Sequence, residues 1–71
     1  MNDQPSMTTI RHRPVVAYKD KPKSGSRYWY SKFAYKDEYK ARQIARIKAE
    51  ELRHKGRSHV IPSVEPVLCE A

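Results

Sequence analysis

The most regular pattern of apolar and polar positions lies between Asp37 and His54, where good helix formers continue without glycine or proline. Its apolar residues recur at helical spacing and form one face: Ala41, Ile44, Ala45, Ile47, Ala49 and Leu52. Asp37 and Glu38 suit the positive end of a helix dipole, and Gly56 suits a left-handed cap after the last turn. The pattern therefore predicts one helix over 37–54.

The N-terminal half is rich in β-branched and aromatic residues and predicts strands. Residues 8–13 and 14–19 are both typical of strands, although Pro14 has to lie at an edge or a break. Pro22 and Gly25 predict a hairpin loop over 20–26, and RYWYSKFAY (27–35) is the strongest strand candidate. The division of residues 8–26 into strands stays open.

Alternation along residues 27–35 predicts which side chains are buried. Trp29 and Phe33 share one face, which we expect to pack against Ile44, Ile47 and Leu52 of the helix. The other face carries Tyr28, Tyr30 and Lys32, which we expect to be exposed. The predicted fold is α+β: a small antiparallel sheet of two or three strands, packed against one C-terminal helix and open on its second face.

Two terminal segments flank this unit, which spans residues 8–57. Residues 1–7 are polar and without periodicity, and predict a flexible leader. In residues 58–71, Pro62 and Pro66 exclude a regular helix, yet the segment is too apolar for a solvated tail. We expect an extended tail that lies against the domain's own core or against a partner, outside the strand–helix unit.

Length and composition narrow the class of protein. A chain of 71 residues, 38% of them hydrophobic, fits one small domain with a modest core. No apolar run approaches the roughly 18–20 residues that span a bilayer, and the first residues lack the order of a secretory signal. Cys69 is the single cysteine, which favours a reducing, cytoplasmic setting.

Charge is concentrated in the predicted domain. All fifteen Lys and Arg residues lie between Arg11 and Arg57, where five acids leave a net charge of +10, against +7 for the whole chain. Such a concentration of cations favours attraction to phosphate, although solubility alone is the alternative explanation.

The predicted open face joins these cations to aromatic side chains. Tyrosine offers a flat apolar ring with a hydroxyl, Lys and Arg offer counter-charge, and a narrow sheet can enter the major groove. Tyrosines that merely stabilise a half-exposed strand are the alternative. The candidate nucleic-acid contacts are Arg11, Arg13, Lys19, Arg27, Tyr28, Tyr30 and Lys32. The helix stripe Arg42, Arg46 and Arg53 is interpreted as a solvated face.

One stretch of the chain resembles a known pattern. SKFAYKDEYKARQIARIKAEEL, preceded by RPVVAYKD and RYWYSKF, covers most of residues 13–52. It resembles in layout the arm-binding domains of tyrosine-type phage integrases and the related AP2-type domains. The resemblance implies a three-stranded sheet followed directly by a helix, with the sheet face in the major groove of DNA and the helix packed behind it.

Candidate metal and catalytic sites are weak. His12, His54, His59 and Cys69 form no metal-binding spacing, and a structural zinc site needs four converging ligands. The chain has no glycine-rich phosphate loop and no Gly-x-Ser-x-Gly motif. We therefore expect a protein without catalytic activity, metal or cofactor.

Three functions fit these observations. The first is a small DNA-binding protein, an accessory of a phage or mobile element, that contacts duplex DNA. The second is a basic inhibitor or adaptor that binds an acidic surface of a larger host complex and uses the 58–71 tail. The third is a structural component of a ribonucleoprotein.

Overall fold

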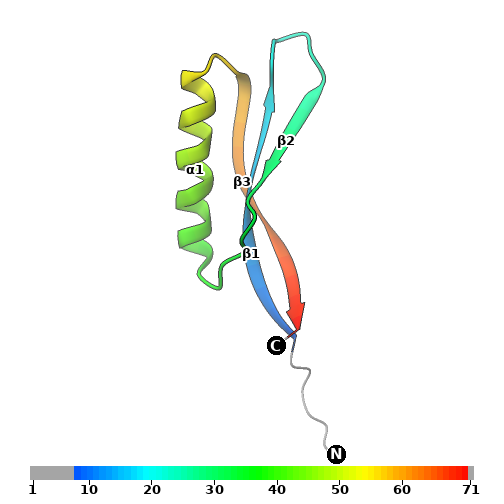
Figure 1. Ribbon diagram of the computed structural model, residues 1–71, viewed down its shortest axis with the longest axis vertical. Helices are drawn as coiled ribbons and strands as arrows, with labels where there is room; N and C mark the ends of the chain where they lie inside the picture. The colour runs from blue at the N-terminus through cyan, green and yellow to red at the C-terminus, as the bar shows by residue number, and fades with distance from the viewer. Residues whose placement is uncertain (1–7, 71) are drawn as a thin grey trace, which may run out of the picture.

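The computed structural model describes residues 8–70, which form a three-stranded antiparallel sheet with one helix packed on it (Figure 1). The elements are β1 (Thr8–Lys19), β2 (Ser26–Tyr30), α1 (Glu38–His54) and β3 (Ser58–Glu70). The order in the sheet is β2-β1-β3. The predicted α+β class is confirmed, and the leader expected over residues 1–7 lies outside the described residues.

The strand order in the chain differs from the layout that the resemblance implies. Two strands precede the helix and the third follows it. The helix therefore carries the chain across β1, from one edge of the sheet to the other. The sequence left open how residues 8–26 divide into strands; residues 8–19 form one continuous strand.

The segment 58–71 was expected to run extended against the domain's own core or against a partner, outside the strand–helix unit. The extended course is confirmed for residues 58–70, but their expected place outside the unit is wrong. These residues form β3, which pairs with β1 along nearly its whole length. The register runs from Thr8 opposite Glu70 to Ala17 opposite Ile61. A bulge follows, where His59 adopts a φ of 53°. The segment is thus one edge of the sheet.

The backbone directions of β1 explain why its proline is tolerated. The N–H of Ser31 donates to the carbonyl of Pro14 at 3.0 Å. His12 exchanges two backbone hydrogen bonds with Tyr35, of 2.6 and 2.8 Å. Even-numbered residues of β1 thus turn their backbone groups toward the β2 side, away from β3. At Pro14, the missing N–H faces a short irregular connection, where the sheet needs no donor.

The same alternation explains the prolines of β3. Pro62 lies opposite Val16 and Pro66 opposite His12, so both prolines pair with even-numbered residues of β1. Val16 and His12 direct their backbone groups away from β3. In such an antiparallel pair the backbone groups of Pro62 and Pro66 point the opposite way, toward the free outer edge of β3. The prolines remove outward donors from this edge, which also protects it against pairing with another strand.

This alternation yields a matched pair of proline substitutions. Ser63, opposite Val15, has an N–H that points at β1, so Ser63→Pro should cost about 1–3 kcal/mol for the lost hydrogen bond, plus a steric clash. Val64→Pro removes only an outward donor and should be much milder. Urea unfolding of the two variants tests this difference, and equal destabilisation would contradict the assigned backbone directions.

The core is built from small side chains. Val16 of β1, Ala45 and Ala49 of α1 are fully buried, and Leu52 is nearly so. Half-buried Tyr18, Trp29 and Val60 close the periphery of this cluster. Because alanine adds little bulk, these side chains permit a close approach of the helix to the sheet. Trp29 was predicted to be buried on the helix side of the sheet. It packs against this cluster but is only half-buried, so the prediction is confirmed in part.

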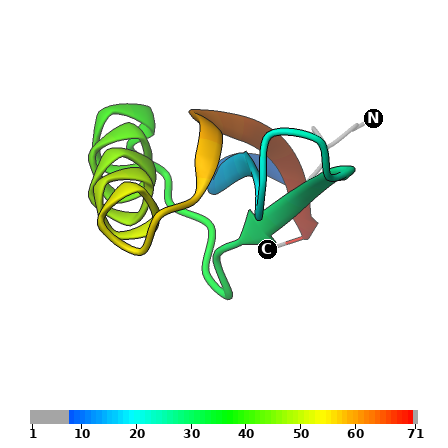
Figure 2. The same ribbon diagram turned by 90° about the horizontal axis from the view of Figure 1, so that it is seen from above.

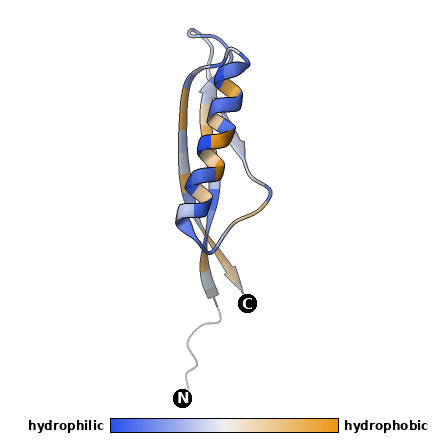
Figure 3. Ribbon diagram, turned by 90° about the vertical axis from the view of Figure 1, so that its left-hand side faces the viewer, coloured by the Kyte–Doolittle hydropathy of each residue, from blue (hydrophilic) through white to orange (hydrophobic). Residues whose placement is uncertain are grey.

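Two hydrophobic residues expected in the core are exposed. Ile47 is 67% exposed, since it lies two residues from both Ala45 and Ala49 and thus on the opposite side of the helix. Phe33 is 66% exposed, because β2 ends at Tyr30 and the strand alternation does not reach it. The outer surface of α1 is otherwise mostly hydrophilic (Figure 3).

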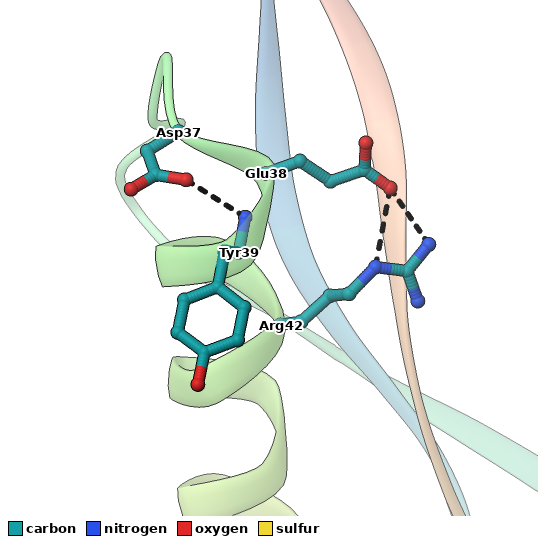
Figure 4. A network of polar contacts seen from close by, with 4 residues as sticks. All are labelled: Asp37, Glu38, Tyr39 and Arg42. Carbon is teal, nitrogen blue, oxygen red and sulfur yellow. Dashed lines mark hydrogen bonds and ion pairs between the residues drawn. The ribbon is translucent and has the colours of Figure 1, made fainter.

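The helix ends follow the sequence signals. Asp37 is the N-cap, and its carboxylate accepts a hydrogen bond of 2.9 Å from the N–H of Tyr39 (Figure 4). Glu38 and Arg42, one turn apart, form an ion pair of 2.7 Å in the same view. Gly56 has a φ of 85°, which confirms its expected left-handed conformation.

Candidate nucleic-acid interface

Two tyrosines lie on the sheet face opposite the helix. Helix α1 packs against β1 and β3, and β2 forms the edge of the sheet that is farther from the helix (Figure 2). Tyr28 and Tyr30 pair with Ala17 and Val15, which alternate with the core residue Val16 and so point away from the helix. Their exposed fractions of 57% and 50% confirm the predicted outward orientation. The ring centroids are 6.3 Å apart, and the ring planes differ by 30°.

An apolar row extends across the sheet beside these rings. Tyr28 pairs with Ala17, and Ala17 pairs on its other side with Ile61 of β3. Ile61 is 61% exposed although it is a large aliphatic residue. We call Tyr28, Tyr30, Ala17 and Ile61 the tyrosine platform. Ile61 was missed at the sequence level because it was assigned to the tail, although its β-branched neighbours are typical of a strand.

Three of the predicted basic contacts share the face of the platform. Arg11, Arg13 and Lys19 alternate with the helix-facing residues of β1. Lys19 lies opposite Ser26, next to the hairpin loop. Arg13 forms a loose ion pair of 3.6 Å with Glu65 across the strands, which lowers its availability for phosphate.

Arg27 does not join this group. It pairs with Tyr18, on the helix side of the sheet, because it alternates with Tyr28. Its guanidinium contacts the carboxylate of Asp20 at 2.7 Å, and Arg57 contacts the same carboxylate at 2.8 Å. Placing Arg27 among the contacts of the open face was therefore wrong. This cluster joins the ends of β1, β2 and β3.

Lys32 lies just beyond the platform rather than in a strand. Ser31 is buried, and its hydroxyl accepts a hydrogen bond of 3.1 Å from the N–H of Phe33, which fixes a local turn. Lys32 within this turn is exposed, two residues after Tyr30. At the other end of the platform, the 20–25 loop carries exposed Lys21 and Lys23 and lies away from the helix (Figure 2). Both lysines were counted in the basic centre, but neither was predicted as a contact.

Acidic partners divide the cations into two groups. On α1, Glu38 pairs with Arg42, Glu50 with Arg53, and Glu51 with both Lys48 and Lys55. Hydrogen bonds and attraction from Lys55 and Lys48 lower the pKa of the Glu51 carboxyl. On or near the open face, in contrast, Arg13 is the one cation with an ion pair among the side chains described, those of residues 9–69. The others have none there: Arg11, Lys19, Lys21, Lys23 and Lys32.

The helix arginines lie beside β3. Arg53 donates to the carbonyl of Val60 at 3.2 Å, and Arg42 and Arg46 line a shallow groove with Pro62 and Ser63. The stripe is exposed, as expected of a solvated face, but it also covers part of the β3 edge. In the described part of the chain, Arg46 has no ion pair, which makes it a useful control cation.

No cluster of three or more His, Cys, Asp or Glu residues that could hold a metal ion occurs within residues 8–70. In the same range, α1 is neither long nor apolar enough to cross a bilayer. No family model, curated protein or solved structure matches this chain.

Proposed function

We propose that this protein is a small non-catalytic nucleic-acid-binding protein, and that its contact surface is the open face of the sheet. The observation that carries the proposal is the tyrosine platform, flanked by lysines that form no ion pair with any side chain described for residues 9–69. Rings provide contacts to bases, and lysines provide contacts to phosphates. DNA as the ligand and an accessory role in a phage or mobile element, in the cytoplasm, are part of the proposal and come from the sequence-level resemblance to integrase arm-binding domains. The fold shares with that layout a sheet backed by one helix, but not the order of the strands.

The alternative of a basic inhibitor or adaptor has lost its main support. It relied on residues 58–71 as an apolar segment that orders on a host protein. Residues 58–70 already form β3 and pair with β1, so this segment is not available as a separate binding element. What supports the alternative now is the net charge of +7, which serves nucleic acid equally well.

The salt dependence of binding tests the proposal. Fluorescence anisotropy with labelled oligonucleotides should show an affinity that falls steeply between about 50 and 200 mM salt. Lys19→Gln and Lys32→Gln should each reduce the slope of log affinity against log salt by about 0.7–0.9, because each removes one phosphate contact.

Arg46→Gln is the matched control, since it removes one unpaired charge from the helix and should leave the slope nearly unchanged. Absence of binding to any nucleic acid at about 50 mM salt would refute the proposal. If Arg46→Gln weakened binding as much as Lys32→Gln, the helix rather than the sheet would be the contact surface.

A further inference from the structure

The centre of the open face lacks the groups that read a duplex. The platform consists of two tyrosines, an alanine and an isoleucine, and Val15 of β1, which lies opposite Tyr30 on the same face, is only 8% exposed. Sequence reading in a groove relies mainly on Arg, Lys, Asn or Gln side chains that reach the edges of base pairs. Here the long cationic side chains flank the platform: Lys19, Lys21 and Lys23 lie at the hairpin end, Lys32 just past Tyr30, and Arg11 and Arg13 farther along β1, where Arg13 is paired with Glu65. The platform itself offers the two rings and Ile61.

The spacing of the rings matches separated bases better than stacked ones. Tyr28 and Tyr30 follow one another on the same strand, and their centroids are 6.3 Å apart. In a duplex, successive bases are about 3.4 Å apart and cover each other's faces, so no base face is available to a tyrosine. An unpaired strand can spread its bases and place one on each half-exposed ring.

The cations extend this arrangement along β2. Lys19, Lys21 and Lys23 lie at the hairpin end of the tyrosine pair, and Lys32 lies just past its other end. A phosphate backbone that runs parallel to β2 would thus meet positive charge before the first ring and after the second. This charge complementarity specifies a polyanion whose path follows the strand.

We infer that the open face binds a single strand of nucleic acid, with two neighbouring bases stacked on Tyr28 and Tyr30 and the flanking phosphates held by the lysines. This inference rests on the proposed function and specifies its ligand. Stacking involves the bases, and the lysines contact the phosphates, so neither interaction depends on the sugar. The face should therefore bind an unpaired strand with deoxyribose or with ribose. Ile61 extends the apolar floor beside the first ring.

Anisotropy with labelled oligo-dT, oligo-rU and a duplex of the same length tests the inference on the full chain. The duplex carries twice the phosphate charge, so tighter binding of the single strands cannot come from charge alone. We expect oligo-dT and oligo-rU to bind within a few-fold of each other, and both to bind tighter than the duplex. Tyr28→Leu and Tyr30→Leu should each weaken single-strand binding by about 5- to 150-fold, which corresponds to the 1–3 kcal/mol of one stacked base. Neither should change the salt slope, since neither removes a charge.

Two kinds of variant separate stacking from other effects. Tyr28→Phe and Tyr30→Phe keep the ring and should retain binding within a few-fold. Tyr39→Leu removes a tyrosine that is 68% exposed on α1 and should leave binding unchanged. Photocrosslinking of oligo-dT to the unaltered protein gives a readout independent of variants, and the crosslinked residues should include Tyr28 or Tyr30.

The outcomes distinguish this inference from the proposed function. A duplex that binds as tightly as the single strands, with no loss in the leucine variants, would overturn the inference and leave nucleic-acid binding intact. Binding of oligo-rU alone would overturn the independence from the sugar. Crosslinks confined to α1 would overturn the assigned surface. No binding of any of the three ligands would refute both.

Discussion

Deletion of residues 58–71 should abolish folding, not merely remove a tail. Without β3, β1 keeps only the five-residue partner β2, and a two-stranded hairpin is marginally stable at best. The deletion also removes Val60 from the core and exposes the helix face that packs on β3. A domain of this size has only a few kcal/mol of stability in reserve, so the loss should exceed it. The measurement is the amide spectrum, which should lose its dispersion, together with loss of helical circular dichroism.

A shorter deletion provides the control. Residues 67–70 pair with residues 8–11 where the two strands extend beyond the first turn of α1 (Figure 1). Ile10 and Leu68, which face each other there, are 56% and 72% exposed and contribute little to the core. Deletion of residues 67–71 should therefore keep the fold with a lowered melting temperature. A dispersed amide spectrum for the chain ending at Arg57 would instead show that β1, β2 and α1 suffice.

Signals confined to one element were predictable from the sequence. The helix is specified by helix formers, by Asp37 at its start and by Gly56 after its end, and all of these act within a few residues. The exposure of Tyr28 and Tyr30 follows from alternation along five residues of β2. Local physics determines such features, so no knowledge of the rest of the chain is needed.

The role of β3 was not predictable because it depends on pairing. Two prolines in one segment normally indicate an irregular structure, and only the register against β1 shows that Pro62 and Pro66 both turn toward the free edge. The exposure of Ile47 likewise depends on which side of α1 meets the sheet. That side is chosen by Ala41, Ala45 and Ala49, which permit a closer approach than isoleucine would.

The kinds of side chain in the candidate site, tyrosines and cations, were predictable from the sequence. Which cations belong to the site was only partly predictable. Whether a cation is available depends on the acids near it in space. Asp20 binds Arg27 of β2 and Arg57, which directly precedes β3, so the two arginines belong to opposite edges of the sheet. Glu65 of β3 reaches Arg13 of β1. These pairs join residues up to 52 positions apart, and nothing in the local sequence indicates them. The lysines of the hairpin loop have no such partner among residues 8–70 and are the better candidates.

The closeness of helix and sheet leads to the second large effect. Ala45 is fully buried between Ala41 and Ala49 along the helix and packs in the same cluster as Val16 of β1. Leucine at this position adds three carbon atoms to a side chain without exposed surface. Either α1 has to move away from the sheet, or the new side chain has to leave its preferred rotamer and turn into the shallow groove that Ala45 lines between α1 and β3. Such overpacking typically costs about 1–3 kcal/mol. In a domain of this size each kcal/mol lowers the melting temperature by about 4–8 °C.

Thermal unfolding of Ala45→Leu, followed by circular dichroism at a helix wavelength, measures this effect. Ile47→Ala is the matched control on the same helix: it changes an aliphatic side chain that is 67% exposed, so it should alter stability by no more than about 0.5 kcal/mol. Unchanged or raised stability of Ala45→Leu would mean that the interface contains unfilled space and that the helix does not approach the sheet as closely as its alanines allow. In that case the alanine stripe would reflect helix propensity alone, and the position of α1 on the sheet would rest on Leu52 and the edge contacts with β3.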